Sequence, residues 1–408
     1  MSALMQEMSE RALRLGVPFS VQLDLTYRCN EKCIHCYLDH DDHGEMTTGE
    51  IKRLLKEMAD AGVFILTLSG GEIFLRKDLF EILEYARALT FCIKLKTNAV
   101  LIRQAQAARL RDLGVESVQI SIYSHRPEVH DAITKVPGSL RRSIDAIRFL
   151  RAQGLKVVVA NVLMTQNMQD YHGVRALAEE IDARYTLDPT ITPKMDGDRS
   201  ILDLNAGESA LRTLFRDEYF VGNADEFCAL PPAPDQSSLA SLPCSAGHTA
   251  CYVSPYGEFY PCVQFPLSCG NVRQQRFIDI WRNSEQLKEV RSIRLRDLSS
   301  CSQCAHGSTC TRCPGLAFME GNMRGPSTAD CEKSYARTGI PSANLLAKKQ
   351  NASAPRLVQI QIVPAITGSR LSSIATSASA EAAREKVVPM CSPPASYNIN
   401  QDIHSSTL

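Results

Sequence analysis

Three cysteines lie close together near the N-terminus, at Cys29, Cys33 and Cys36, with the spacing C-x3-C-x2-C. They follow an apolar-alternating run, Val21 to Leu25, so they belong to a loop after a predicted strand. Three thiolates on one short loop can hold three irons of a cubane iron–sulfur cluster, which normally has four cysteine ligands. One iron then stays open to a ligand from outside the protein. Two other interpretations fit the same residues: a Cys3His zinc site that includes His35, or three unrelated core cysteines.

A second group of nine cysteines lies between residues 244 and 331. It contains two C-x2-C pairs, Cys301/Cys304 and Cys310/Cys313, and ends at Cys331. So many thiols in a short segment exceed what packing needs and indicate metal binding. Taken alone, the paired cysteines fit a zinc ribbon as well as an iron–sulfur domain.

Composition sets bounds on location and partners. The chain has 408 residues with 45 Lys+Arg and 45 Asp+Glu, so no excess charge favours nucleic acid or an anionic membrane surface. The first residues lack the apolar core of a signal peptide, and no apolar run reaches the ~20 residues that span a bilayer. We therefore expect a cytoplasmic protein without nucleic-acid or membrane partners. In that compartment, 15 cysteines indicate metal or redox chemistry rather than disulfides.

The elements that must position the first cysteines alternate between strand and helix. Predicted helices, several ending at a glycine, separate six predicted strands, at 21–26, 63–68, 92–97, 115–122, 155–164 and 184–192. Such alternation implies parallel strands joined by right-handed crossovers. Six units are too few for a closed eight-fold barrel. We therefore predict an α/β fold in which a partial (β/α)6 TIM-like barrel is followed by a small cysteine-rich domain.

Polar segments follow the ends of these predicted strands. Ser69-Gly70-Gly71-Glu72 follows the second strand, while Asn98 and Ser121 end the third and fourth. Because the reactive groups of such barrels lie after the carboxyl ends of strands, we expect these residues to face the cysteine loop across one rim. The alternatives are a tight strand–helix turn with Glu72 in solvent, and local backbone hydrogen bonds for Asn98 and Ser121.

The cysteine loop and the glycine turn together resemble the radical S-adenosylmethionine (SAM) superfamily. The resemblance implies that Cys29, Cys33 and Cys36 hold a [4Fe–4S] cluster whose open iron binds SAM. Residues Gly70, Gly71 and Glu72 are similar to the family's GGEP segment, with Ile73 in place of the proline, and by that resemblance contact the amino group of SAM. By the same resemblance, Asn98 and Ser121 approach its ribose and carboxylate.

The second cysteine group resembles the SPASM extension of radical SAM enzymes, and the match runs from Cys244 to Cys331. It departs from the pattern at one step, with two residues rather than three between Cys310 and Cys313. The resemblance implies two auxiliary [4Fe–4S] clusters. The inner one would use Cys244, Cys262, Cys313 and Cys251, with Cys269 as the rival fourth ligand; the outer one would use Cys301, Cys304, Cys310 and Cys331.

A domain organisation follows from these assignments. We predict a lead-in helix at 1–18, the radical SAM barrel at 19–219, a linker at 220–243, the iron–sulfur SPASM domain at 244–335 and an Ala/Ser-rich, disordered tail at 336–408. Inside the fourth segment, the turn at 254–257 predicts a hairpin over 251–262.

The resemblance implies an enzyme that cleaves SAM reductively and removes a hydrogen atom from its substrate. Peptides are the family's commonest substrates, so we expect a cross-link, thioether, epimerisation or oxidation in a ribosomal peptide precursor or a protein side chain. Expected partners are this peptide, reduced flavodoxin or ferredoxin as electron donor, and a separate precursor-recognition protein. The other hypotheses are a radical SAM enzyme for a small molecule or tetrapyrrole, as in haem-pathway relatives, and a zinc-binding interaction protein.

Overall fold

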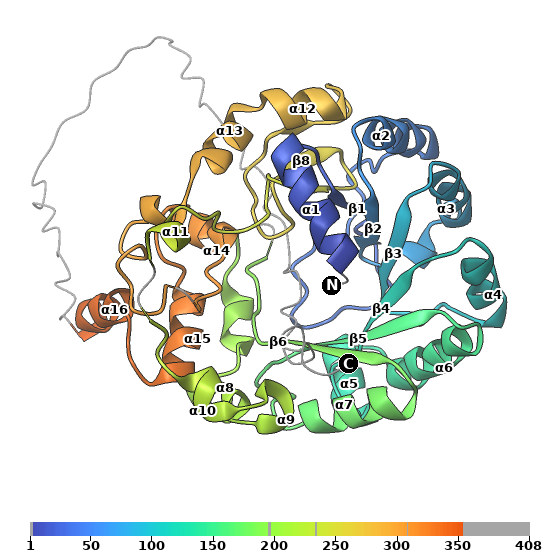
Figure 1. Ribbon diagram of the computed structural model, residues 1–408. Coiled ribbons are helices and arrows are strands. Elements are labelled where there is room, and N and C mark those ends of the chain that lie inside the picture. The colour runs from blue at the N-terminus through green and yellow to red at the C-terminus, as the bar shows by residue number, and fades with distance from the viewer. Residues whose placement is uncertain (1–2, 195–196, 233–234, 308, 354–408) are drawn as a thin grey trace, which may run out of the picture.

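One curved sheet of nine strands organises the structure, with helices around its outer side (Figure 1). The computed structural model describes residues 3–194, 197–232, 235–307 and 309–353. Six neighbouring strands are parallel and follow the chain in order: β1 (Ser20–Thr26), β2 (Ile65–Gly70), β3 (Cys92–Thr97), β4 (Ser117–Ser121), β5 (Lys156–Val162) and β6 (Arg184–Asp188). The sheet order β6-β5-β4-β3-β2-β1-β7-β8-β9 leaves two free edges. The predicted α/β fold with a partial barrel is therefore confirmed.

Helices connect these strands and pack against the outer face of the sheet. They are α2 (Thr48–Asp60), α3 (Leu79–Ala88), α4 (Gln104–Asp112), α6 (Ser139–Ala152) and α7 (Tyr171–Glu180). Helix α2 begins at a capping box between Thr47 and Glu50, as the spacing predicts. Its buried residues Ile51, Leu54, Leu55 and Met58 share one core with the outward-facing strand residues. Burial of this apolar stripe, more than helix propensity, holds such a helix in place.

The cysteine-rich segment extends the same sheet. Strand β7 (Ala250–Val253) pairs parallel to β1, from Ser20/Ala250 to Leu23/Val253. It is followed by the antiparallel strands β8 (Glu258–Tyr260) and β9 (Gly270–Asn271). The predicted hairpin is therefore confirmed. Its attachment to β1 was not predicted, because parallel pairing between segments far apart in sequence leaves no local pattern.

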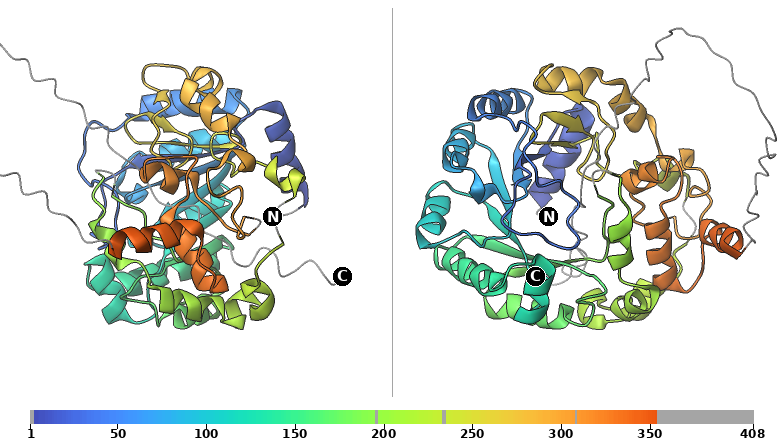
Figure 2. Two further views of the ribbon diagram at one scale, coloured as in Figure 1. Left: turned by 90° about the vertical axis from the view of Figure 1, so that its left-hand side faces the viewer. Right: turned by 180° about the vertical axis from the view of Figure 1, so that it is seen from behind.

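The C-terminal helices continue the ring from β9 round to the β6 side (Figures 1 and 2). They are α12 (Phe277–Asn283), α13 (Glu285–Ser292), α14 (Pro314–Met319), α15 (Thr328–Thr338) and α16 (Ala343–Ser353). Near the β6 edge, α15 packs against α8 (Glu208–Phe215), and Arg216 donates a hydrogen bond to the Ala336 carbonyl (3.3 Å). This closure places the cysteine-rich segment beside the open side of the barrel.

Several predicted segment boundaries differ from the structure. Helix α1 covers Ala3–Leu15 of the lead-in segment. The expected linker contains α10 (Ala224–Cys228), α11 (Gln236–Leu239) and the end of α9 (Glu218–Val221). The boundary at 335/336 falls inside α15, and α16 is helical where a disordered tail was expected. Residues 354–408 lie outside the described part of the chain. Among the described helices, none has the length and apolar character needed to cross a bilayer.

Candidate functional site

The loop that carries the first three cysteines is fastened at its base. Glu45 accepts hydrogen bonds from the Thr26 hydroxyl (2.6 Å) and the Tyr27 backbone N–H (2.9 Å), so the two ends of the loop are tied together. Arg76 donates to the carbonyls of Leu25 (2.9 Å) and Met46 (3.1 Å), which lie before and after the loop. The loop therefore leaves and re-enters the barrel at one point.

The cysteine-bearing part of the loop is held by a helix that the sequence analysis did not predict, α5 (Pro127–Thr134). The backbone N–H groups of Lys32 and Ile34 donate to the carbonyls of Thr134 and Ile133, both at 3.0 Å. Seen from behind, the blue segment after β1 lies over the centre of the ring (Figure 2). Proline at the first helical position was the available signal for α5.

The glycine turn after β2 lies against the backbone that leads into Cys29. The Gly71 N–H donates to the Thr26 carbonyl (2.8 Å), and the Glu72 N–H donates to the Arg28 carbonyl (2.9 Å). A Cβ at Gly70 would collide with the Thr26 carbonyl oxygen, and one at Gly71 would lie 2.6 Å from the Tyr27 oxygen and closer still to that of Arg28. Both glycines are therefore required for close approach to the cysteine loop, and both also line the central cavity.

Glu72 is fully buried and does not line that cavity. Its carboxylate accepts hydrogen bonds from the Phe74 N–H (2.9 Å), the Thr97 hydroxyl (2.8 Å) and the Asn98 N–H (2.9 Å). Burial raises the pKa of Glu72, and these donors act in the opposite direction. The side chain therefore fixes the end of β3, and it is not in solvent as the alternative interpretation supposed.

Asn98 and Ser121 both line the cavity. The Asn98 side-chain N–H donates to the Asn30 side-chain oxygen (2.8 Å) and lies 3.8 Å from the Cys29 sulfur. Hydrogen bonds to ligand sulfurs are one way in which a protein sets the potential of an iron–sulfur cluster. Asn98 therefore acts on the cysteine loop itself, beyond the local backbone contact with Val100 (3.0 Å).

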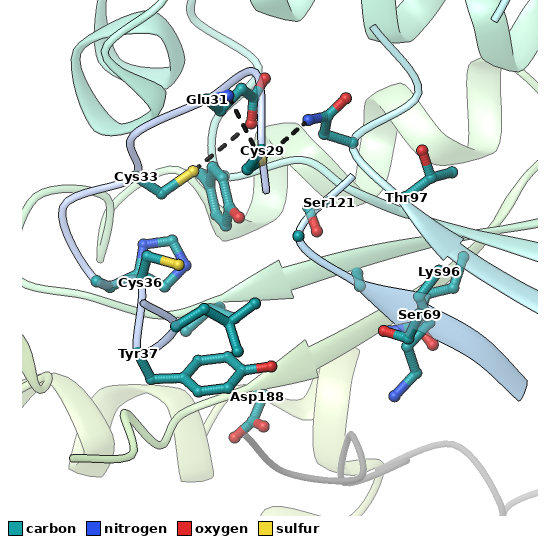
Figure 3. A pocket seen from close by; sticks show the side chains of 18 of the residues that line it. Cys29, Glu31, Cys33, Cys36, Tyr37, Ser69, Lys96, Thr97, Ser121 and Asp188 are labelled. Atoms are coloured by element: carbon teal, nitrogen blue, oxygen red, sulfur yellow. Dashed lines mark hydrogen bonds between the residues drawn. The ribbon is translucent and has the colours of Figure 1, made fainter. Parts of the chain in front are cut away.

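The three thiols face the carboxyl ends of the strands (Figure 3). Burial raises the pKa of Cys29 to about 12 and that of Cys36 to about 11, and it also raises the pKa of Cys33 well above its usual value. Coordination to iron removes these protons, because the thiolate is the metal ligand. Two nearby buried atoms, Glu31 Oε1 and His35 Nδ1, have no partner among the described residues. Three thiols, together with these two buried polar atoms, fit a cavity that holds an iron–sulfur cluster on thiolates and a polar small molecule beside it.

The cavity has a volume of about 210 Å³ and also contains charged residues that the sequence analysis missed. Lys96 donates to the Gln22 side-chain oxygen (3.1 Å), and burial lowers its pKa. Asp188 ends β6, and burial raises its pKa to about 6. The sequence contains a signal for Lys96. In β3, Lys94 and Lys96 alternate with the apolar residues Ile93 and Leu95, and such alternation indicates a strand with one polar face. By contrast, Thr165, which follows β5, and Lys194, in the loop after β6, do not line this cavity.

Three cysteines of the predicted inner set lie on one side of the hairpin. Cys262 packs against the inner tyrosine cluster of Tyr27, Tyr252 and Tyr260, and Cys244 packs in the same small core as Cys262. Cys313 interacts electrostatically with both. Burial is the largest cause that raises its pKa, and Cys262 and Cys244 raise it further. Cys251 and Cys269 instead belong to the main core under the outer helices. The structure therefore places the expected fourth ligand, Cys251, and its rival in a different apolar cluster from Cys244 and Cys262, although Cys262 adds to the effect of burial in raising the pKa of Cys251.

The four cysteines of the predicted outer set line one small cavity of about 50 Å³: Cys301, Cys304, Cys310 and Cys331. Burial raises the pKa of Cys301 to about 11, and it also raises those of Cys310 and Cys331. In addition, an Asn344 side-chain N–H lies 3.6 Å from the Cys331 sulfur. Four thiols from two segments, 301–310 and 331, are thus brought together by the fold.

Direct contacts connect the cysteine-rich segment with the barrel cavity. Gln264 donates to the Thr192 hydroxyl (3.1 Å) and lies 3.7 Å from the Cys313 sulfur. Lys333 pairs with Asp330 (2.8 Å) and donates to the Thr190 hydroxyl (3.0 Å). Since Thr190 and Thr192 line the barrel cavity, the inner cysteine set adjoins that cavity.

Within the described residues, no three histidine, cysteine or carboxylate side chains converge closely enough to hold a single metal ion. A zinc site needs its donors at about 2.0–2.3 Å from one ion. The thiolates of a cubane cluster bind separate irons and need not converge in this way.

Comparisons with known proteins agree with this geometry. Residues 23–179 match the model of the radical SAM superfamily, and residues 244–314 match that of an iron–sulfur cluster-binding domain, SPASM. The chain is 30% identical over 325 residues to the mycofactocin maturase MftC of Mycolicibacterium smegmatis (75% of this chain, 81% of MftC). It is 28% identical over 340 residues to the AdoMet-dependent heme synthase of Oleidesulfovibrio alaskensis (76% and 87%). The fold is similar to that of Streptococcus suis SuiB bound to the precursor peptide SuiA (TM-score 0.63, 18% identity, 80% of each chain).

Proposed function

Because this chain belongs to the radical SAM superfamily and carries a SPASM domain, it is an enzyme that works with SAM and [4Fe–4S] clusters, and we propose that it modifies a peptide. When bound, SAM and its cluster supply a 5′-deoxyadenosyl radical that removes a hydrogen atom from the substrate. A maturase among the relatives and a peptide-bound structure among the neighbours support a peptide as substrate.

The chain's own residues have distinct roles in this proposal. Cys29, Cys33 and Cys36 hold the SAM-binding cluster, and Asn98 donates a hydrogen bond toward the Cys29 sulfur. Backbone at Gly70 and Gly71, together with Ser121, borders the space for SAM. Glu72 is a positioning residue, since it holds Thr97 and Asn98 in place.

Room for a peptide is the observation that carries the proposal. A second cavity of about 270 Å³ lies between the loop after β6 and helices α14 and α15, and it shares Ile191 with the central cavity. Two adjoining hollows of this kind suit an extended chain better than one compact molecule. We propose that the peptide enters along the second cavity and places its reacting residue in the first.

The test uses the candidate peptide encoded beside the gene, SAM and dithionite, with mass spectrometry of the peptide. We expect a discrete mass change with wild-type protein. Cys33→Ala should abolish formation of 5′-deoxyadenosine, whereas the matched control Cys92→Ala, at the start of β3, should retain it. Cys304→Ala should leave some uncoupled SAM cleavage but no product. Retained cleavage in Cys33→Ala, or full product with Cys304→Ala, would contradict the assignments.

A tetrapyrrole is the second candidate substrate, because the heme synthase relative is similar over a comparable length. A haem precursor incubated with SAM and dithionite separates the two hypotheses, since turnover would change its visible spectrum. An altered tetrapyrrole with an unaltered peptide would overturn the peptide proposal. We further propose reduced flavodoxin or ferredoxin as the electron donor, and a separate protein that presents the precursor peptide.

A further inference from the structure

Arg312 lies at the boundary between the two sets of auxiliary cysteines. It follows Cys310 by two residues and directly precedes Cys313. Its side chain is buried, with 8% of the residue exposed. The guanidinium donates from Nε to the Gly325 carbonyl (2.7 Å) and from Nη2 to the Met323 carbonyl. Its remaining nitrogen, Nη1, is buried and has no partner among the described residues.

The hydrogen bonds of Arg312 do not compensate its charge, because both acceptors are neutral carbonyl groups. A buried charge is unfavourable unless an opposite charge lies close to it. The cation lies near both cysteine sets. It directly precedes Cys313 of the inner set in the chain, and its charge also acts against burial, which raises the pKa of Cys244 and of Cys301 to about 11. It also lines the outer cavity beside Cys301, Cys304 and Cys310. The buried carboxylate of Asp330 lines the same cavity but pairs with Lys333 (2.8 Å), so thiolate-held clusters on either side would supply the negative charge that faces Arg312.

We propose that Arg312 acts as a fixed positive charge between the two auxiliary clusters and thereby raises the reduction potential of each. The inference rests on the proposed assignment of the auxiliary cysteines. Reduction adds one electron to a cluster and makes it more negative, with no bond made or broken. A nearby cation in a medium of low dielectric constant stabilises that reduced form.

A purely structural role is the competing explanation, since the two carbonyl contacts also brace the turn at 323–325. Arg337 provides a matched control within the same domain. It is equally buried, with 9% exposed, contacts Thr309 through both Nη atoms, and has an unpartnered Nε. However, it lines a different cavity, and its charge acts on His306, whose pKa is lowered first by burial and then by Arg337. Its removal should disturb packing without changing the field at the auxiliary cysteines.

The experiment compares the full chain, reconstituted anaerobically with iron and sulfide, as wild type, Arg312→Gln, Arg312→Lys and Arg337→Gln. Iron content is measured first, followed by dithionite titration monitored by electron paramagnetic resonance. The SAM-binding cluster is identified by the change in its signal when SAM is added. For Arg312→Gln we expect full iron, lower potentials for both auxiliary clusters and an unchanged SAM-binding cluster. Arg312→Lys should show a smaller shift and Arg337→Gln none.

Wild-type potentials in an iron-replete Arg312→Gln protein would overturn the proposal, as would an equal shift in Arg337→Gln. If Arg312→Gln loses iron, Arg312→Lys decides. If Arg312→Lys restores the iron content and has potentials near those of the wild type, the role of charge is supported. If Arg312→Lys also loses iron, Arg312 has a bracing role and the proposal is overturned. No measurement uses a peptide, so failure of peptide modification would refute the proposed function and leave this inference standing.

Discussion

Replacing Gly71 by alanine should detach the glycine turn from the cysteine loop. The added Cβ would lie 2.6 Å from the Tyr27 carbonyl oxygen, whereas real Cβ atoms essentially never come within 3.0 Å of such an atom. The obstacle is backbone, fixed by Glu45 and Arg76 at the base of the loop. The turn must therefore move by several tenths of an ångström, away from the residues that lead into Cys29.

The size of the effect follows from the contacts that this movement breaks. Two backbone hydrogen bonds join the turn to the loop, Gly71 to Thr26 and Glu72 to Arg28. Each contributes about 1 kcal/mol net, and a buried group left without a partner costs about 1–3 kcal/mol. We expect a loss of roughly 2–4 kcal/mol in the free energy of unfolding. Iron content at the first site should fall as well, because Cys29 loses its support.

Thermal unfolding and iron analysis of the anaerobically reconstituted protein test this expectation. Gly49→Ala is the matched control: it lies in the first turn of α2, and nothing is within 4 Å of its added Cβ. That variant should be neutral or more stable by about 0.5–1 kcal/mol. Wild-type stability and full iron in Gly71→Ala would refute the argument that close approach explains this glycine.

Three other predictions concern buried groups. Glu72→Gln should lower stability by about 1–3 kcal/mol, because the Phe74 and Asn98 N–H groups donate to different carboxylate oxygens and an amide keeps only one accepting oxygen; an unchanged unfolding temperature would contradict this. Burial raises the pKa of Asp24 to about 6, above its usual 3.8, so the folded state binds an extra proton between these values. Stability should thus fall as pH rises through that window, and Asp24→Asn should flatten the pH dependence of the unfolding temperature; equal slopes would refute it. Cys262→Ala should remove about one cluster's worth of iron, whereas Cys251→Ala should not, and equal iron loss would place Cys251 at the inner cluster after all.

Much of the architecture was predictable because its signals are local. The capping box of Thr47 and Glu50 and the apolar face of α2 both follow helical spacing, which can be recognised in contiguous residues. The turn at 254–257 produced the expected hairpin. Helix α5 was missed because its eight residues are too short for a clear apolar period. Yet it holds the loop that the whole site depends on.

The candidate site was predicted as a set of residues, and not as a set of contacts. Gly70 and Glu72 were both expected to contact SAM. Gly70 lines the cavity and also accommodates the Thr26 backbone, whereas the Glu72 carboxylate lies outside the cavity and holds the end of β3. Cys251 was expected beside Cys262. In β7, however, Cys251 faces the main core and its neighbour Tyr252 faces the inner cluster that contains Cys262, because consecutive residues of a strand face opposite sides. Spacing along the chain does not specify which side of the strand a cysteine takes.

By itself, the sequence determined the strand order, the rim on which the first cysteines lie and the family, because periodicity and motif spacing are properties of contiguous residues. Only the tertiary structure decided that β7 pairs with β1, that Lys96 and Asp188 share a cavity with Cys29, and that Arg312 lies between two sets of thiols. These outcomes depend on burial and on pairing between distant segments. The energies of such contacts are set by the whole packed chain and are not encoded in any one stretch of it.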